Sequence, residues 1–395
     1  MKANDASFEK YETLTDGSIA MLAFVAAVSV ANGYYVQPLL LQIGEALGVP
    51  AHLLGVLPGL SQIGLAFGLV ALLPLADSHS ARKVLFAVIP LQICALLLMA
   101  TASGGLVLMA GSFLIGLFGV TPYVLPPFAS LRVPATRLGH TTGRLSRGVI
   151  SGILLARSIA GVVAVHFGWR YVYFFAVVAM MGMLGVVARI VKPQKCNSSV
   201  SYKELLASLL RLFRKQPALR VAAACQWLSF SSFNVFWIGS SFYLNEKFHW
   251  KADAIGYVGV LGAFAAFFAP WIGKLADRVG PAKTRIVALT AMVAGWCVFA
   301  FWSDNLPVMA MGLIVLDVGA AVADISNRTL LYLGDREVRT RVNAVYQIAM
   351  FGGASVMSAF VGIVWYWRGW PAVCLFGGGC AGLSGLIAWR YRHYS

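Results

Sequence analysis

The feature that most limits how this chain can fold is its series of long apolar segments separated by short polar ones. A helix needs roughly 20 apolar residues to cross the hydrocarbon core of a bilayer. Segments of this kind lie at residues 17–43, 53–76, 84–102, 104–130, 145–166, 169–190, 220–244, 254–276, 285–303, 306–333, 341–366 and 369–390. Hydrophobic residues fill 59% of the 395 positions and charged residues only 12%, so lipid must surround the fold. The sequence therefore predicts an all-α membrane protein with twelve transmembrane helices.

The 31 Lys and Arg residues fall mainly on one side of these predicted helices. They gather in the loops around 82–83, 132–144, 192–215, 274–285 and 336–341, whereas the opposite side offers Arg170, Lys247, Lys251 and Arg368. Loops rich in Lys and Arg stay on the cytoplasmic side of a membrane. We therefore expect both termini to be cytoplasmic, in a bacterial inner membrane. The net charge of +16 then reflects this rule and an attraction to anionic lipids, and it does not indicate binding to nucleic acid.

The longest polar stretch divides the chain in the middle. We expect a cytoplasmic tail at 1–16, a six-helix bundle at 17–191, a cytoplasmic linker at 192–219 and a second six-helix bundle at 220–395. Within the linker, apolar residues recur at helical spacing: Tyr202, Leu205, Leu206, Leu209, Leu210 and Phe213. Cations lie largely on the other side, which predicts an amphipathic helix on the cytoplasmic leaflet that joins the two bundles.

Several motifs occur twice in the chain. The triplet Leu-Ala-Asp occurs at 75–77 and again at 275–277, each time after the second predicted helix of its half. Gly-Trp pairs at 168–169 and 369–370 open the last helix of each half, and Asn32 and Asn234 lie in the first helices. These offsets indicate a parallel duplication of a six-helix unit, so the two bundles should be pseudo-symmetric.

The repeated loop resembles the G-x-L-A-D-R-x-G-R-K pattern of the major facilitator superfamily. The second copy retains Gly273, Leu275, Ala276, Asp277, Arg278, Gly280 and Lys283. The first retains Leu75, Ala76, Asp77, Arg82 and Lys83, but has Leu73 and Ser78 where Gly and Arg are expected. The segments 31–40, 152–161, 168–173 and 341–354 are similar to bacterial drug and metabolite exporters of that superfamily, in its drug/proton antiporter-like branch. The resemblance implies alternating access between two bundles, a small-molecule substrate and function as a monomer.

The resemblance implies a role for the two Asp residues of the repeated loop. An Asp at a helix end can accept hydrogen bonds from a neighbouring helix N-terminus and pair with nearby cations. The resemblance implies that Asp77, Arg82 and Lys83, and Gly273, Asp277, Arg278, Gly280 and Lys283, form a latch that is made in only one of two transport states. The alternative is that the two Asp residues are solvated turn residues.

Three ionisable residues stand out inside the predicted spans, where an unpaired charge costs several kcal/mol. Arg157 and Asp317 fall near the middle of their helices, and Asp324 shares a helix face with Asp317 and Arg328. Burial favours the neutral form of a carboxyl group and a nearby Arg favours the ionised form, so Asp317 and Asp324 are candidates for proton coupling. Arg157 would hold an anionic group of the substrate or act as an exchangeable partner. The alternative is permanent pairing that only holds helices together.

Amide and aromatic side chains accompany these charges. The candidate substrate-binding residues, besides Arg157, are Asn32, Tyr35, Gln37, Gln62, Gln226, Asn234, Trp237, Asn343 and Gln347. Stacking area combined with a few hydrogen bonds suits an amphipathic organic ligand. For any one of these residues the alternative is a hydrogen bond between helices.

No motif for catalysis, nucleotides or metals is convincing. The chain has no Walker loop, no H-E-x-x-H and no G-x-S-x-G, and its cysteines form no C-x-x-C pair. Gly377, Gly379 and Gly382 match G-x-G-x-x-G inside the last apolar span, where small-residue helix packing explains them. We therefore expect neither an enzyme nor a metal or cofactor site, with the proton gradient as energy source. The expected function is proton-coupled efflux of a small organic molecule, such as a drug, sugar, siderophore or other metabolite. The alternative is uptake of a small organic anion recognised by Arg157.

Overall fold

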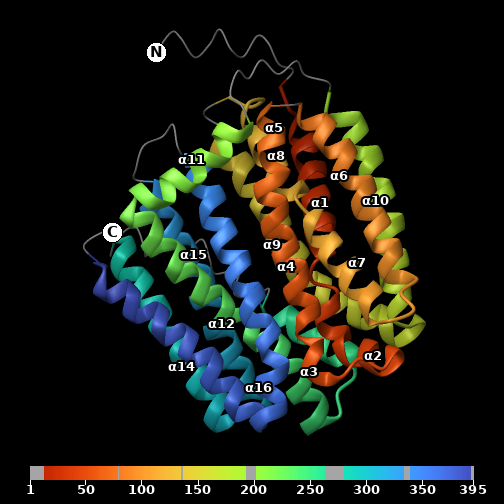
Figure 1. Cartoon of the computed structure of the whole chain (residues 1–395), viewed down its shortest axis with the longest axis vertical. Helices are drawn as coiled ribbons and strands as arrows, with labels where there is room; N and C mark the ends of the chain where they lie inside the picture. Colours follow the sequence, from red (N-terminus) through yellow and green to blue (C-terminus); the bar gives the residue numbers. More distant parts are fainter. Residues whose placement is uncertain are drawn as a thin grey trace.

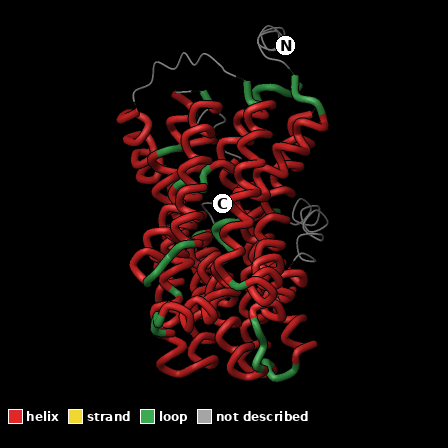
Figure 2. Tube along the Cα trace, turned by 90° about the vertical axis from the view of Figure 1, so that its right-hand side faces the viewer, coloured by secondary structure: helices red, strands yellow, loops and turns green. Residues whose placement is uncertain are grey.

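The computed structural model describes residues 13–78, 80–134, 137–192, 202–262, 280–332 and 339–392, and every regular element in these ranges is a helix (Figures 1 and 2). Fifteen of the described helices are labelled as in Figure 1: α1 Asp16–Ala31, α2 Val36–Leu47, α3 Ala51–Leu54, α4 Val56–Ala71, α5 Leu73–Ser78, α6 Ala81–Ala100, α7 Gly105–Leu117, α8 Thr121–Ser130, α9 Leu138–Phe167, α10 Trp169–Ile190, α11 Tyr202–Lys215, α12 Pro217–Phe248, α14 Pro281–Trp302, α15 Leu306–Tyr332 and α16 Arg339–Arg390.

The described helices agree with the expected membrane spans. Ten helical segments are long and apolar enough to cross a membrane, where consecutive helices such as α1 and α2 count as one segment. The last, Arg341–Arg390, has 50 residues and contains two non-helical residues, Arg368 and Gly369, so it makes two crossings. A shorter apolar helix, Ala252–Gly262, lies where the eighth span is expected. The other eleven predicted spans therefore have counterparts in the structure, whereas residues 263–276 of the eighth lie outside the described residues.

The first span is broken near its middle. Helix α1 ends at Ala31 and α2 begins at Val36, with tight turns at 32–35. Pro38 has no N–H, so it cannot bond to the carbonyl of Tyr34, which accepts from the Gln37 N–H at 3.3 Å. The break falls on residues that the sequence places in the candidate binding site, and it gives adjacent side chains different directions.

One charged residue is placed differently from the sequence expectation. Arg285 was assigned to a basic loop, but it lies in α14 and is only 1% exposed. The reason is that α14 begins earlier than predicted, at Pro281, directly after Gly280. Arg285 Nη1 donates to Asn327 Oδ1 at 3.3 Å, so the guanidinium points into the second half of the fold.

Helix α11 packs against the second half. Its side chains Leu209, Leu212 and Phe213 contact a buried cluster of Leu219, Ala222, Leu331, Val342, Val345 and Tyr346. The protein therefore covers at least part of the apolar face that the sequence assigned to the leaflet, whereas Leu210 is 53% exposed. The side chains of Tyr202, Leu205 and Leu206 lie outside the described residues.

Helices from the two parts of the chain meet closely at the end of the molecule opposite α11, where α2 and α3 lie in Figure 1. A Cβ on Gly55 would lie 2.6 Å from the Ser358 carbonyl oxygen, and one on Gly59 would lie 3.6 Å from Ser358 Cβ. Gly161 of α9 similarly faces the backbone of Ala252. Glycine allows these backbones to approach because it has no side chain to separate them.

Candidate functional site

Arg157 lies on α9 in a buried, mostly aromatic setting. It is 1% exposed, its Nε donates to Gln37 Oε1 at 2.7 Å, and its Nη1 donates to the Ile153 carbonyl at 3.3 Å. The guanidinium carbon lies 4.1 Å from the ring centre of Trp237 and 5.3 Å from that of Tyr34. Such contacts stabilise a cation through the ring quadrupole. Among the described residues, Nη2 has no hydrogen-bond partner.

Asp317 lies on α15 and is 5% exposed. Neither carboxylate oxygen has a hydrogen-bond partner within the described part of the chain. Its Oδ2 lies against Gly262, where a Cβ would approach to 2.5 Å, and the same point is 3.0 Å from Leu154 Cδ2 of α9. The Trp237 indole lies beside the carboxyl group, and its Nε1 has no hydrogen-bond partner among the described residues.

Arg157 and Asp317 come from different halves, and the sequence could not tell whether they meet. They lie close enough for their charges to interact, but they form no hydrogen bond with each other. Arg157 Nη2 and both carboxylate oxygens of Asp317 therefore lack hydrogen-bond partners among the described residues. This arrangement can hold a proton, a ligand group or a direct ion pair after a small movement.

Asp324 differs from Asp317, because its carboxylate has hydrogen-bond partners. Its carboxylate accepts from Arg328 Nε at 2.9 Å and from the Tyr346 hydroxyl at 2.8 Å. Arg328 Nη1 also donates to Asn343 Oδ1 at 2.8 Å. Asp324 and Asn343 therefore belong to one ion-pair network on α15 and α16, which matches the structural alternative for these two residues.

Two candidate amides join the halves through a direct hydrogen bond. Gln62 of α4 donates from Nε2 to Asn234 Oδ1 of α12 at 2.7 Å, and Asn234 Nδ2 donates to the Phe230 carbonyl at 2.9 Å. Ser241 of α12 donates to the backbone carbonyl of Gln37 at 3.3 Å. These contacts bring Gln37, Gln62 and Asn234 together at the interface between the halves.

The other amide candidates are more scattered. Gln226 accepts from Asn327 Nδ2 at 3.2 Å, so it belongs to the network that contains Arg285. Gln347 is buried, and its Oε1 has no partner among the described residues. The same holds for both side-chain polar atoms of Asn32. None of these three amides forms a hydrogen bond with another candidate residue among the described residues.

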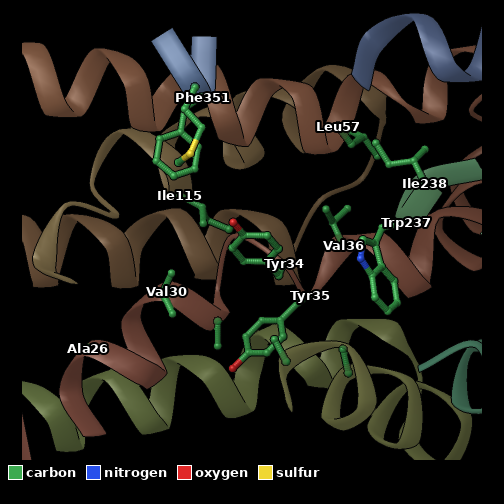
Figure 3. Packing of buried hydrophobic residues seen from close by; sticks show 14 of the residues in the cluster. Ala26, Val30, Tyr34, Tyr35, Val36, Leu57, Ile115, Trp237, Ile238 and Phe351 are labelled. Atoms are coloured by element: carbon green, nitrogen blue, oxygen red, sulfur yellow. The ribbon is translucent and has the colours of Figure 1, made fainter. Parts of the chain in front are cut away.

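Sequence reasoning selected Tyr35, but its neighbour Tyr34 lies next to Arg157. Figure 3 shows the two rings pointing away from each other, with Tyr34 directed toward Ile115 and Phe351. Tyr34 and Phe351 line a cavity of about 30 Å³ together with Ser29, Val30, Gly33, Ser61, Gln62, Leu65, Gln92, Ile115, Gly116 and Gly119. The clue in the sequence was the Gly33 to Pro38 segment, which marks the break in the helix.

Aromatic rings extend from this group along the interface. Phe351 of α16 has edge contacts with Tyr123 of α8 at 6.2 Å and with Phe230 of α12 at 5.6 Å between ring centres. Phe230 stacks on Phe233 at 5.8 Å. Of these rings, only Phe233 was noticed in the sequence, because an aromatic residue in an apolar span has the same local pattern whether it faces lipid or a site.

The latch residues are only partly described. Gly273, Asp277, Arg278 and the side chain of Asp77 lie outside the described residues. Arg82 Nη1 donates to the carbonyls of Ala188 and Val191 at 3.0 and 2.6 Å, so it caps the C-terminal end of α10 within its own half. Gly280 has φ of +92°, which explains a glycine there without any latch. The side chain of Lys83 is exposed, as is that of Lys283.

Comparison with known proteins fits this architecture. The family model of the Major Facilitator Superfamily matches residues 22–331 and 222–395. The chain is 30% identical over 381 residues to the uncharacterized transporter YgaY of Escherichia coli O157:H7, covering 96% of this chain and 97% of that protein. It is also 30% identical over 188 residues to the multidrug resistance protein MdtG of Escherichia fergusonii, covering 45% of this chain and 44% of that protein.

Solved structures agree at the level of the fold. A crystal structure of the nucleoside transporter NupG matches with a TM-score of 0.76 at 12% identity, covering 95% of this chain and 99% of that one. The all-α fold is therefore confirmed, and so is the expectation that the chain is not an enzyme. The protein is a multi-pass membrane transporter that belongs to the Major Facilitator Superfamily.

Proposed function

We propose that this protein is a proton-coupled exporter of small organic molecules, with Asp317 as the group that carries the proton. The observation behind this proposal is the state of its carboxyl group. Asp317 is 5% exposed and lacks a hydrogen-bond partner among the described residues, although the charged Arg157 lies nearby. Asp324, by contrast, is held by Arg328 and Tyr346.

The physical basis is the cost of an ionised group in a medium of low dielectric constant. A buried carboxylate without hydrogen bonds is unfavourable, and protonation removes that cost. Approach of Arg157 would stabilise the ionised form instead. Because Arg157 and Asp317 belong to different halves, relative movement of the halves changes the distance between them. Alternating access would thereby change the proton affinity of Asp317 during each cycle.

The direction of transport and the cargo rest on two further observations. Partial similarity to a protein named for multidrug resistance favours export. The rings of Tyr34, Phe233 and Trp237 around Arg157 favour an organic cargo with aromatic or other flat apolar surface. In an antiport cycle, the cargo binds while Asp317 is ionised and is released when Asp317 takes up a proton.

The proposal also includes a placement in the cell. The basic loops support a bacterial inner membrane, cytoplasmic termini and contact with anionic lipids. Within it, the bundles span 17–191 and 220–395 and work as one monomer. Asp77 and Asp277 remain candidates for a latch on the cytoplasmic side.

The test uses inside-out membrane vesicles in which respiration builds a pH gradient that an acridine dye reports. A panel of organic compounds is added, and export by antiport dissipates the gradient. We expect wild type to respond to a subset of compounds and Asp317→Asn to respond to none of them. Asp304→Asn serves as the control, because that carboxylate lies in an exposed loop. A response retained in Asp317→Asn would reject Asp317 as the coupling group.

The second candidate function is proton-coupled uptake of a small organic anion. It is favoured by Arg157 Nη2, which is buried and has no partner among the described residues. Charge balance separates the two functions, because an anion at Arg157 binds best when Asp317 is protonated. Calorimetry in two buffers of different ionisation enthalpy measures the protons exchanged on binding. Proton release supports export by antiport, whereas proton uptake supports anion symport.

A further inference from the structure

Gln37 of α2 gives Arg157 a neutral hydrogen-bond partner in place of the carboxyl group that lies nearby. The Arg157 Nε–H group can only donate, so the Gln37 amide must present Oε1 to it, at 2.7 Å. The orientation of the amide is therefore determined, and its Nε2 has no partner among the described residues. Gln37 is 1% exposed, so bulk water does not compete for this acceptor. In this arrangement, the bond to Gln37 keeps Arg157 Nε away from Asp317.

The other two nitrogens of the guanidinium are less firmly held. Nη1 donates to the Ile153 carbonyl, one turn earlier on α9, at 3.3 Å, and Nη2 has no partner within the described part of the chain. The ring of Trp237, from the second half, lies 4.1 Å from the guanidinium carbon. A hydrogen bond from Arg to a carboxylate is stronger than one to a neutral amide. Arg157 therefore lies near a stronger partner, Asp317, but is bonded to a weaker one.

The two possible partners of Arg157 respond differently to pH. Gln37 Oε1 accepts at every pH, because an amide does not titrate, whereas Asp317 attracts Arg157 only when it is ionised. Among the described residues, Arg157 is the charged group that faces Asp317, while Trp237 and Gly262 face it without a charge. Tyr34 is the other titratable group beside Arg157. A cation that exchanges partners needs one acceptor that remains when the carboxylate is protonated, and Gln37 supplies it.

The backbone of Gln37 is connected to the second half. Ser241 Oγ of α12 lies 3.3 Å from the Gln37 carbonyl oxygen and 3.1 Å from the Trp237 carbonyl oxygen of its own helix. A hydroxyl group has a single hydrogen, so Ser241 shares it between an acceptor in each half. When the halves move relative to one another, Ser241 can give up Gln37 and keep its bond to Trp237. The position of Gln37 therefore depends on the second half through a contact that costs little to break.

We propose that Gln37 is a positioning residue for proton coupling, which withholds Arg157 from Asp317 until the contact of α2 with the second half changes. Release of the guanidinium then lets Arg157 pair with ionised Asp317, and this pairing favours loss of the proton. This role rests on the proposed function, because that function assigns the proton to Asp317. It requires no contact between Gln37 and the cargo.

The test measures proton binding at Asp317 in the purified full-length protein, in a maltoside detergent that has no carbonyl group of its own. Infrared difference spectroscopy between pH values records the carbonyl band of a protonated carboxyl group, and the band that Asp317→Asn lacks belongs to Asp317. Gln37→Met nearly preserves the side-chain volume and removes the amide acceptor. We expect Asp317 to bind its proton roughly tenfold or more weakly in this variant, because Arg157 then turns to the carboxylate. Unchanged proton binding would overturn the proposal.

Gln42→Met is the matched control. Gln42 lies on the same helix and also contacts α9, because its Nε2 donates to the Ala164 carbonyl at 3.3 Å, but its Oε1 has no partner among the described residues. We expect wild-type proton binding at Asp317 in this variant. Gln37→Leu, which is smaller, replaces Gln37→Met if the longer side chain does not fit, with the same expected result. An equal change in Gln42→Met would indicate a general effect of packing and refute the role of Gln37.

A double-mutant cycle shows whether Gln37 acts through Arg157. In an Arg157→Gln background there is no guanidinium to withhold, so addition of Gln37→Met should leave proton binding at Asp317 unchanged. A purely structural disturbance would persist in that background. Persistence of the effect without Arg157 would therefore contradict the positioning role.

Failure of this proposal can be distinguished from failure of the proposed function, because the infrared titration needs neither a cargo nor a gradient. If Asp317→Asn still exports in response to the gradient while Gln37→Met weakens proton binding, Asp317 is not the coupling group, but Gln37 does position Arg157. If Asp317→Asn loses export and Gln37→Met titrates like wild type, the coupling role of Asp317 stands and the role of Gln37 is refuted.

Discussion

At the scale of single residues, the most informative contact is the one between Asp317 and Gly262. The carboxyl group occupies space that exists because position 262 has no side chain, since a Cβ there would come within 2.5 Å of Oδ2. The glycine therefore keeps room for a carboxyl group that has no hydrogen bond among the described residues. Gly262 comes from the eighth span, so two helices of the second half jointly position this group.

Gly262→Ala should therefore impair coupling more than folding. The added methyl group would push the carboxyl group away from the eighth span, change its distance to Arg157 and alter its proton affinity. We expect at least a several-fold loss of gradient-driven export in vesicles, with normal amounts of protein in the membrane. Gly379→Ala should export like wild type, because a Cβ there would meet no atom of the described residues within 4 Å. The helix packing that the sequence suggested for Gly377, Gly379 and Gly382 is therefore wrong for Gly379 and Gly382, and only Gly377 packs closely, against Trp296. Wild-type export by Gly262→Ala would show that the space around Oδ2 is not needed.

At the scale of secondary-structure elements, helix starts depend on a few glycines. Gly280 precedes α14 with φ of +92° and ψ of +141°, a conformation that side chains disfavour. Gly104 precedes α7 with φ of −168°, which any residue adopts. In both positions a Cβ would meet no atom within 4 Å, so the backbone angle is the relevant difference between them.

Gly280→Ala should destabilise the protein by about 1–3 kcal/mol, the typical cost of such backbone strain. Thermal unfolding of the purified protein should begin at a lower temperature than in wild type. Gly104→Ala should unfold at or slightly above the wild-type temperature. The prediction fails if the two variants unfold alike.

Helix α11 offers a second test at this scale. Leu212 packs against the buried cluster that contains Tyr346, whereas Leu210 is 53% exposed. Leu212→Asp should release α11 and make the linker more sensitive to limited proteolysis, because a buried unpaired carboxylate costs several kcal/mol. Leu210→Asp should be cleaved at the wild-type rate. Equal cleavage of the two variants would mean that α11 does not dock on the second half.

At the scale of the whole molecule, the proposed alternating access requires the close contacts opposite α11 to open. A Cβ on Gly59 would lie 3.6 Å from Ser358 Cβ, within the range of a disulfide. A Cβ there would also lie 2.9 Å from the Ser355 carbonyl, so a small shift of the helices is needed.

The double variant Gly59→Cys with Ser358→Cys should thus cross-link the two halves under oxidation. In a background with the native cysteines replaced, we expect oxidation to stop export and a reductant to restore it. Each single variant should export in both conditions. Export that continues in the cross-linked protein would show that this contact does not separate during transport.

Much of the whole-molecule picture could be predicted from the sequence. Span lengths and basic loops are local properties, because a membrane imposes a fixed apolar length on each crossing. The repeated Leu-Ala-Asp triplets carried the resemblance to the family. Arg285 was predicted to lie in a loop because the start of its helix was placed a few residues too late. Sequence patterns locate the ends of helices less reliably than their existence.

The site was predictable only in part. Arg157 and Asp317 were identified because a charge inside an apolar span is costly and so unusual. Asp324 had the same signal, but Tyr346, which donates to its carboxylate, lies on another helix. Tyr35 was selected over Tyr34 because the direction of each ring depends on the break in the first span.

The sequence by itself determined that the chain crosses a membrane repeatedly and that Arg157, Asp317 and Asp324 lie within its spans. The tertiary structure decided which of those charges are paired, which glutamines have an acceptor without a partner among the described residues, and which glycine makes room for Asp317. The physical reason is that apolar length and charge belong to single segments. Hydrogen-bond satisfaction belongs to groups on different helices, and it exists only once those helices have packed together.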